Sequence, residues 1–149
     1  MLLFLDIDGV MVPAMGWKSP DFLNDGFPAF SKKAVNSLQK ILSEDDTIIL
    51  TTSHKSKYSI DEWKNIFKKR EVKIEKIKLL PENVNHASRK DEIMNWLNEN
   101  IINEEFIIID DDHSLNELPE YLKNHLIQTS SLIGLTEKHA EIIKSITLK

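Results

Sequence analysis

Residues 1–10, MLLFLDIDGV, contain a short apolar run that ends abruptly in two aspartates and a glycine. An apolar run of this length predicts a strand buried on both faces, which is typical of a parallel sheet. The glycine predicts a turn, because glycine adopts a positive φ without strain. Ligands of open α/β sheets bind outside the carboxyl ends of the strands, so Asp6 and Asp8 are expected at that edge. An aspartate after a strand also commonly caps a turn, and the motif alone leaves both interpretations open.

Two further apolar runs end in polar clusters in the same way. TIIL at residues 47–50 is followed by TTSHK at residues 51–55, and FIII at residues 106–109 is followed by DDDH at residues 110–113. Segments with helical spacing of apolar residues lie between these runs. The alternation predicts a three-layer, doubly wound α/β fold with a mainly parallel sheet.

The other elements are expected from caps and periodicity. Ser31, Ser59 and Thr136 are predicted helix N-caps, and Ser59 with Glu62 forms a capping box. We expect an edge strand at Val72–Leu80. The remaining expected elements are a helix at Lys90–Asn98, an interrupted helix at Leu115–Lys123 and a final strand at Leu126–Thr129.

Residues 11–28 hold three prolines and no clear periodicity, so we expect an irregular flap over the carboxyl edge of the sheet. Trp17, Phe22 and Phe27 are expected to hold this flap against the rest of the molecule. Long loops in compact domains are often functional, although a loop that only packs explains the same composition.

Length and composition limit the class of protein. Residues 1–149 are expected to form a single domain. The chain contains no cysteine, so disulfides and thiolate metal sites are excluded. The N-terminal run lacks a basic region, and no run approaches the ~20 apolar residues that span a bilayer. We therefore expect a cytoplasmic protein without membrane association.

The net charge of −5 argues weakly against a nucleic-acid-binding protein. The charge is unevenly distributed, because residues 55–78 hold nine lysines or arginines against four acidic residues. Solvated faces of one helix and one strand account for most of these lysines. A basic surface for a phosphorylated macromolecule is the alternative interpretation.

The polar residues that follow the three strands suit metal binding. Parallel strands end at one edge, so the side chains after them converge there. Carboxylates brought close together repel unless a cation or a proton lies between them, and oxygen ligands favour Mg²⁺. The predicted metal ligands are Asp6, Asp8 through its backbone carbonyl, Asp110 and Asp111.

The same groups can perform phosphoryl transfer. Asp6 is the candidate nucleophile that forms an aspartyl-phosphate, and Asp8 is the candidate general acid and base. Thr51 and Lys90 are expected to hold the phosphate oxygens.

Two of these assignments have alternatives. Thr52 or Ser53 can take the role of Thr51, because the end of the strand is uncertain by a few residues. Lys90 has Arg89 as its neighbour, and a surface residue at a helix start is the alternative, although the other motifs favour the functional role. His54 and Lys55 lie beside this edge and are further candidates for substrate contact.

With these motifs in order, the chain resembles the haloacid dehalogenase (HAD) superfamily. The matching segments are D-x-D-G-V at Asp6–Val10, Thr51 in LTTSHK, Lys90 in SRKDEI, Asp110–Asp112 in IIIDDD, and Gly134–Thr136. The resemblance covers essentially the whole chain. It implies a Mg²⁺-dependent phosphatase that acts through an aspartyl-phosphate.

A narrower resemblance is to the HAD domains associated with Swiss Army Knife RNA repair proteins. Those domains often read S-S/T-S-W-R after the second strand, where Thr51–Lys55 has His54 at the tryptophan position. The segments between motifs are too short for a cap domain, so the chain resembles the capless type. Capless members tend to accept phosphates on macromolecules or to borrow closure from a partner.

Three functions remain in view. A phosphatase acting on an unidentified phosphomonoester is the leading hypothesis, and a phosphatase of nucleic-acid ends in RNA or DNA repair is its alternative. A non-catalytic HAD-fold module that binds a partner is the third, although intact Asp6 and Asp8 argue against it. A receiver domain fits less well, because Lys90 precedes Asp110. The sequence predicts neither the substrate nor the oligomeric state.

Overall fold

A computed structural model describes residues 1–14 and 19–147 of the chain. Its centre is a five-stranded, all-parallel sheet with the strand order β3-β2-β1-β4-β5. The expected α/β fold with a parallel sheet is therefore confirmed. The strands are β1 (Leu2–Leu5), β2 (Thr47–Leu50), β3 (Lys76–Leu79), β4 (Phe106–Asp110) and β5 (Leu126–Gln128).

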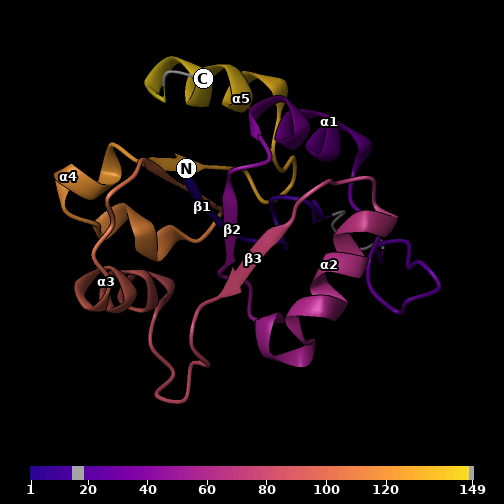
Figure 1. Cartoon of the computed structure of the whole chain (residues 1–149), viewed down its shortest axis with the longest axis horizontal. Coiled ribbons are helices and arrows are strands. Elements are labelled where there is room, and N and C mark those ends of the chain that lie inside the picture. Colours follow the sequence, from indigo (N-terminus) through magenta and orange to yellow (C-terminus); the bar gives the residue numbers. More distant parts are fainter. Residues whose placement is uncertain (15–18, 148–149) are drawn as a thin grey trace.

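Helices cover both faces of the sheet (Figure 1). The first face packs against α1 (Lys32–Ile41), α2 (Ile60–Lys69) and α5 (Glu137–Ile146). The opposite face packs against α3 (Arg89–Glu99) and α4 (Glu120–Lys123). Two 3₁₀ helices, η1 (Lys55–Lys57) and η2 (His113–Glu117), lie in the connections.

The apolar runs alternate between the two cores. In β1, Leu3 and Leu5 belong to the core under α1, α2 and α5, whereas Leu2 and Phe4 belong to the core under α3 and α4. This arrangement explains why the strand is apolar at every position, since parallel strands are buried on both faces.

The three predicted N-caps are present in the structure. Ser31 caps α1, and Thr136 caps α5. Ser59 and Glu62 form the expected capping box of α2. In the described part of the chain no cap domain interrupts these elements, as the short segments between motifs predicted. No described helix has the length and apolar character needed to cross a membrane.

The predicted strand at Val72–Leu80 was too long. Only Lys76–Leu79 pairs with β2, at the edge of the sheet as expected. The preceding residues reverse the chain after α2, because Glu71 has a φ of 64° and the Val72 backbone N–H donates to the Phe67 carbonyl. The alternation of apolar residues in this segment therefore reflects burial of Val72 beside α2 rather than strand pairing.

The predicted anchoring of the flap is confirmed in part. Phe27 is buried against Tyr58 and Trp63. Phe22, in contrast, is 57% exposed, so it was wrongly expected to hold the flap down. Trp17 lies outside the described residues.

The flap is also anchored by Arg70, the C-cap residue of α2. Its guanidinium contacts the Asp25 carboxylate at 2.7 and 2.9 Å and donates to the carbonyls of Phe27 and Pro28. The same group lies over the rings of Phe27 and Phe30. Hydrogen bonds from Arg70 lower the pKa of Asp25 to about 2.

This ion pair predicts a specific dependence of stability on pH. The folded-state pKa of Asp25 lies below its ordinary value of 3.8, so the pair stabilises the fold above pH 4 and loses its contribution as the pH falls toward 2. We expect Asp25→Asn to lower the free energy of unfolding by about 1–2 kcal/mol at pH 7, after allowance for solvent screening. Urea unfolding of both proteins should show this difference shrinking below pH 4. A difference that is constant with pH would contradict the assignment.

Candidate active site

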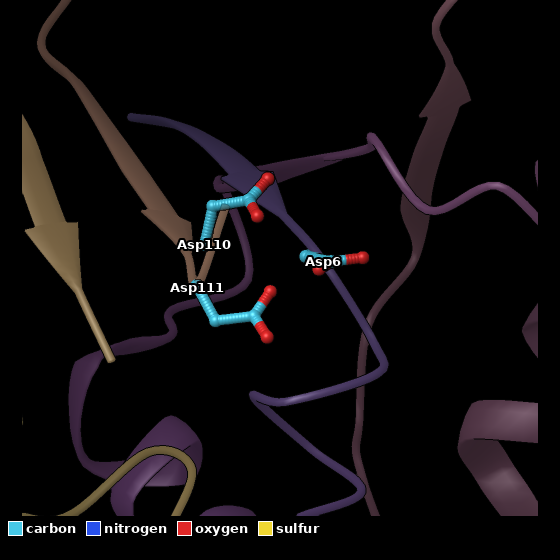
Figure 2. A group of neighbouring side chains, drawn as sticks. All are labelled: Asp6, Asp110 and Asp111. Atoms are coloured by element: carbon cyan, nitrogen blue, oxygen red, sulfur yellow. The ribbon is translucent and has the colours of Figure 1, made fainter. Parts of the chain in front are cut away.

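Three aspartates from two adjacent strands meet at the carboxyl edge of the sheet. Asp6 follows β1, and Asp110 and Asp111 lie at the end of β4. One carboxylate oxygen from each lies within 4.8 Å of those of the other two. Figure 2 shows the side chains of Asp110 and Asp111 extending from β4 toward Asp6. Asp6 and Asp110 are buried and Asp111 is partly buried.

Strand register explains this convergence. Leu5 in β1 pairs with Leu50 in β2 on one side and with Ile109 in β4 on the other. The next residues along the three strands are Asp6, Thr51 and Asp110, so these three residues lie side by side across the sheet. The predicted convergence of these three segments at one sheet edge is what the structure shows.

Two carboxyls of this cluster, those of Asp6 and Asp110, lie in an environment that disfavours their charge. Burial raises the pKa of Asp6 to about 9, and repulsion from Asp110 adds to the rise while Arg89 opposes it. Burial also raises the pKa of Asp110, against the opposing effect of Arg89. A cation among these oxygens would favour their ionised forms. The donor set, all oxygen and close together, fits a hard divalent ion.

Arg89, the first residue of α3, is the cation that contacts this cluster. Its Nη1 lies 2.5 Å from Asp110 Oδ2 and 3.6 Å from Asp6 Oδ2, and it donates to Thr51 Oγ1 at 3.3 Å. The carboxylates of Asp110 and Asp6 raise the pKa of Arg89 above its ordinary value despite its burial. Arg89 Nε is buried without a hydrogen-bond partner, and Glu92 Oε1 lies 3.7 Å away.

The two threonines after β2 are fully buried beside the cluster. Thr51 Oγ1 donates to Asp110 Oδ2 at 3.2 Å. Thr52 Oγ1 accepts the backbone N–H of His54 at 3.2 Å. Ser53, the third candidate from the sequence, is exposed.

The glycine of the first motif is required by close packing. Gly9 has a φ of 81°, and a Cβ at this position would lie 2.0 Å from Asp111 Oδ2. The turn is also fixed from the other end of the chain, because Thr129 Oγ1 donates to the Gly9 carbonyl at 2.7 Å. The turn after β1 therefore presses directly against one of the candidate metal ligands.

Asp8 points to a different partner from the other three aspartates. Its side chain is 57% exposed, and Asp8 Oδ2 lies 2.8 Å from His54 Nε2. The carboxylate thus lies outside the cluster of Asp6, Asp110 and Asp111. This position is compatible with a role in proton transfer at the open side of the site.

The two lysines singled out from the sequence lie in other surroundings. Lys90 follows Arg89 in α3 and is partly buried, and its backbone N–H donates to Ser114 Oγ. Lys55 is buried and forms an ion pair of 2.9 Å with Glu92. Lys55 is therefore neutralised within the fold, and its side chain has little surface left for contact with a substrate.

Sequence reasoning did not assign a role to Arg89 and did not find the contact between His54 and Asp8. One signal for Arg89 was available. It lies four residues before Ile93, the fully buried residue of α3, so both side chains share one face of the helix.

The comparisons with known proteins place these observations in a family. A family model described as the HAD domain in Swiss Army Knife RNA repair proteins matches residues 2–140. Searches of the curated proteins and of the solved structures found no match.

Proposed function

This chain belongs to the family of HAD domains in Swiss Army Knife RNA repair proteins, and from this we propose that the protein is a phosphatase of nucleic-acid ends. HAD domains are usually phosphohydrolases, and the family description favours a phosphorylated nucleic-acid end over an unspecified small phosphomonoester. The observation that carries the proposal is the buried cluster of Asp6, Asp110 and Asp111 with Arg89 and Thr51 beside it.

The carboxylate cluster is the proposed metal site. Asp6, Asp110 and Asp111 would hold the ion, with the backbone carbonyl of Asp8 as a further ligand. When bound, Mg²⁺ would supply positive charge that keeps these carboxylates ionised and offsets the negative oxygens of the phosphate. The raised pKa of Asp6 supports the need for such a charge.

In the proposed reaction Asp6 is the nucleophile, and Asp8 is the general acid and then the general base. A carboxylate oxygen of Asp6 attacks the phosphorus while the bond to the leaving oxygen breaks, and the proton of Asp8 passes to that oxygen. The product is an acyl phosphate on Asp6. Asp8 then takes a proton from water, and the water oxygen attacks the phosphorus. The bond to Asp6 breaks, which releases inorganic phosphate and restores both aspartates.

The negative oxygens of the phosphate need donors around the nucleophile. Arg89 is the strongest candidate, because its guanidinium already lies between Asp6, Asp110 and Thr51. Guanidinium groups bind phosphate through paired N–H donors. Thr51 and Thr52 supply the adjacent hydroxyls, and Lys90 remains a second candidate cation at the same helix start.

The open side of the site supports a large substrate. In the described residues no cap domain covers this edge, and Asp8 is exposed there. The basic run at residues 55–78 is not one surface, since Lys55 pairs with Glu92 and Arg70 with Asp25. Lys57 is exposed beside His54 and is the member of the run best placed to meet a phosphate backbone.

A phosphate-release assay tests this function. RNA and DNA oligonucleotides with a 3′- or 5′-phosphate, nucleoside monophosphates and sugar phosphates are assayed with Mg²⁺ and with a chelator. We expect Mg²⁺-dependent release, with an oligonucleotide end giving the highest kcat/KM and a KM that rises with salt, because phosphate contacts release counterions. Absence of metal-dependent release from every substrate would favour the binding module, and a preference for a small phosphomonoester would contradict the nucleic-acid assignment.

A further inference from the structure

A chain of three polar side chains leads away from the candidate acid and base. Lys57 Nζ lies 3.0 Å from His54 Nδ1, and His54 Nε2 lies 2.8 Å from Asp8 Oδ2. The three residues come from two segments that are far apart in the sequence, the turn after β1 and the connection between β2 and α2. The contact between them is therefore a product of the fold and not of local sequence.

The lysine determines which nitrogen of His54 carries the proton. An ammonium group has donors and no acceptor, so Lys57 must donate to His54 Nδ1. A nitrogen that accepts this bond carries no proton, and the proton of the neutral ring then lies on Nε2. His54 Nε2–H consequently donates to Asp8 Oδ2.

The imidazole is held in place from several sides. The ring of Phe27 meets it edge to face, with centroids 5.8 Å apart. The His54 backbone N–H donates to Thr52 Oγ1, and the Lys57 backbone N–H donates to the His54 carbonyl. The following turn is fixed in addition by Trp63 Nε1–H, which donates to the Lys55 carbonyl at 3.0 Å.

We propose that His54 is a positioning residue for Asp8, with Lys57 selecting the ring tautomer that donates to it. The proposal rests on the proposed function, in which Asp8 moves the proton. Without His54, an exposed aspartate could rotate freely between solvent and site. With one oxygen held by His54, the other oxygen is left to give its proton to the leaving group. A surface contact between His54 and Asp8 without this role would contribute little to either activity or stability.

Substrates with different leaving groups separate positioning from a structural role. A ribose or deoxyribose hydroxyl is a poor leaving group and needs a proton as its bond breaks, whereas p-nitrophenolate leaves readily without one. The ratio kcat/KM reports only the steps up to the departure of the leaving group. Loss of Asp8 positioning should therefore lower kcat/KM for an oligonucleotide phosphate more than for p-nitrophenyl phosphate.

The kinetic test compares four variants with the wild type on these two substrates: three substitutions of His54 and one control at Lys73. We expect His54→Ala to lower kcat/KM by roughly 10- to 100-fold for the oligonucleotide and by less than about 3-fold for p-nitrophenyl phosphate. His54→Gln should recover most of the loss, because its amide nitrogen reaches the position of Nε2, and the shorter His54→Asn should not. Lys57→Ala is tested by the ring tautomer of His54 and not by turnover, because loss of a phosphate contact would by itself lower kcat/KM for the oligonucleotide. Lys73→Ala is the matched control, since Lys73 is exposed near the amino end of β3, at the opposite edge of the sheet.

Equal losses for both substrates, no loss, or equal recovery by glutamine and asparagine would overturn the positioning role.

A second measurement does not depend on turnover. Long-range ¹⁵N spectra of the wild type, at a pH where the ring is neutral, should show His54 protonated on Nε2, and the opposite tautomer would also overturn the proposal. An inactive wild type with the expected tautomer would refute the proposed phosphatase and the catalytic part of this inference together. An active wild type whose variants keep the wild-type substrate ratio would refute the inference alone.

Discussion

Asp6→Asn should abolish phosphate release from every substrate that the wild type accepts, with a loss of roughly 10⁴-fold or more. The asparagine amide retains the size of the side chain but is too weak a nucleophile to form the acyl phosphate. It also removes one charge from the group of three carboxylates whose oxygens lie within 4.8 Å of one another. Phosphate release in the presence of Mg²⁺ measures the loss, and mass spectrometry of acid-quenched protein should detect an acyl phosphate on the wild type only.

The stability of this variant provides the control for folding. The folded-state pKa of Asp6 is about 9, whereas its ordinary value is 3.8. Between these two pH values the unfolded chain ionises Asp6 more readily than the folded chain does, so the stability of the metal-free fold falls as the pH rises from about 4 to about 9. We expect Asp6→Asn to unfold at the same or a higher temperature than the wild type in chelator, with an advantage that grows with pH. Asp45→Asn, at an exposed carboxylate before β2 and so at the opposite edge of the sheet, should retain full activity. Activity in folded Asp6→Asn would exclude the aspartyl-phosphate.

Arg89→Ala should lower kcat/KM for an oligonucleotide phosphate by roughly 10²- to 10³-fold, the usual effect of removing a donor that stabilises charge in the transition state. The variant also leaves Asp110 without its buried cation, so the metal-free protein should unfold at a lower temperature. Lys90→Ala should cause a much smaller loss, because the guanidinium of Arg89 and not the ammonium of Lys90 contacts Asp110 and Thr51. Steady-state kinetics and thermal unfolding of both variants test this difference.

Arg89→Lys separates charge from geometry. A lysine keeps the positive charge but lacks the planar set of donors, so we expect partial activity and nearly full stability. If Lys90→Ala reduced activity more than Arg89→Ala, the assignment from sequence motifs would be right and the assignment from the structure wrong.

The sequence predicted those parts of the fold and the site that depend on local pattern. Apolar runs ending at Leu5, Leu50 and Ile109 defined three strands, and their parallel pairing placed the next residue of each strand at one level. The caps Ser31 and Ser59 were equally local signals, and both are present. Asp6 and Asp110 could therefore be brought together without coordinates.

Contacts between distant loops could not be predicted in this way. Arg89 and Lys90 are neighbouring cations at a helix start, and only the orientation of α3 on the sheet decides which one reaches Asp110. The contact between His54 and Asp8 depends on two connections whose lengths carry no periodicity. Phe22 was expected to be buried because it is aromatic, yet burial on an irregular loop follows from where the loop lies.

The order β3-β2-β1-β4-β5 puts the strands that carry Asp6, Thr51 and Asp110 in the middle, with one strand on each flank. Edge strands fray first in native-state hydrogen exchange, whereas central strands open only with the whole fold. The amides of β3 and β5 should thus exchange ahead of those of β1, and transient opening of β3 leaves the cluster of Asp6, Asp110 and Asp111 in place. The proposed activity should consequently persist when β3 opens, and it should be lost when the central strands unfold.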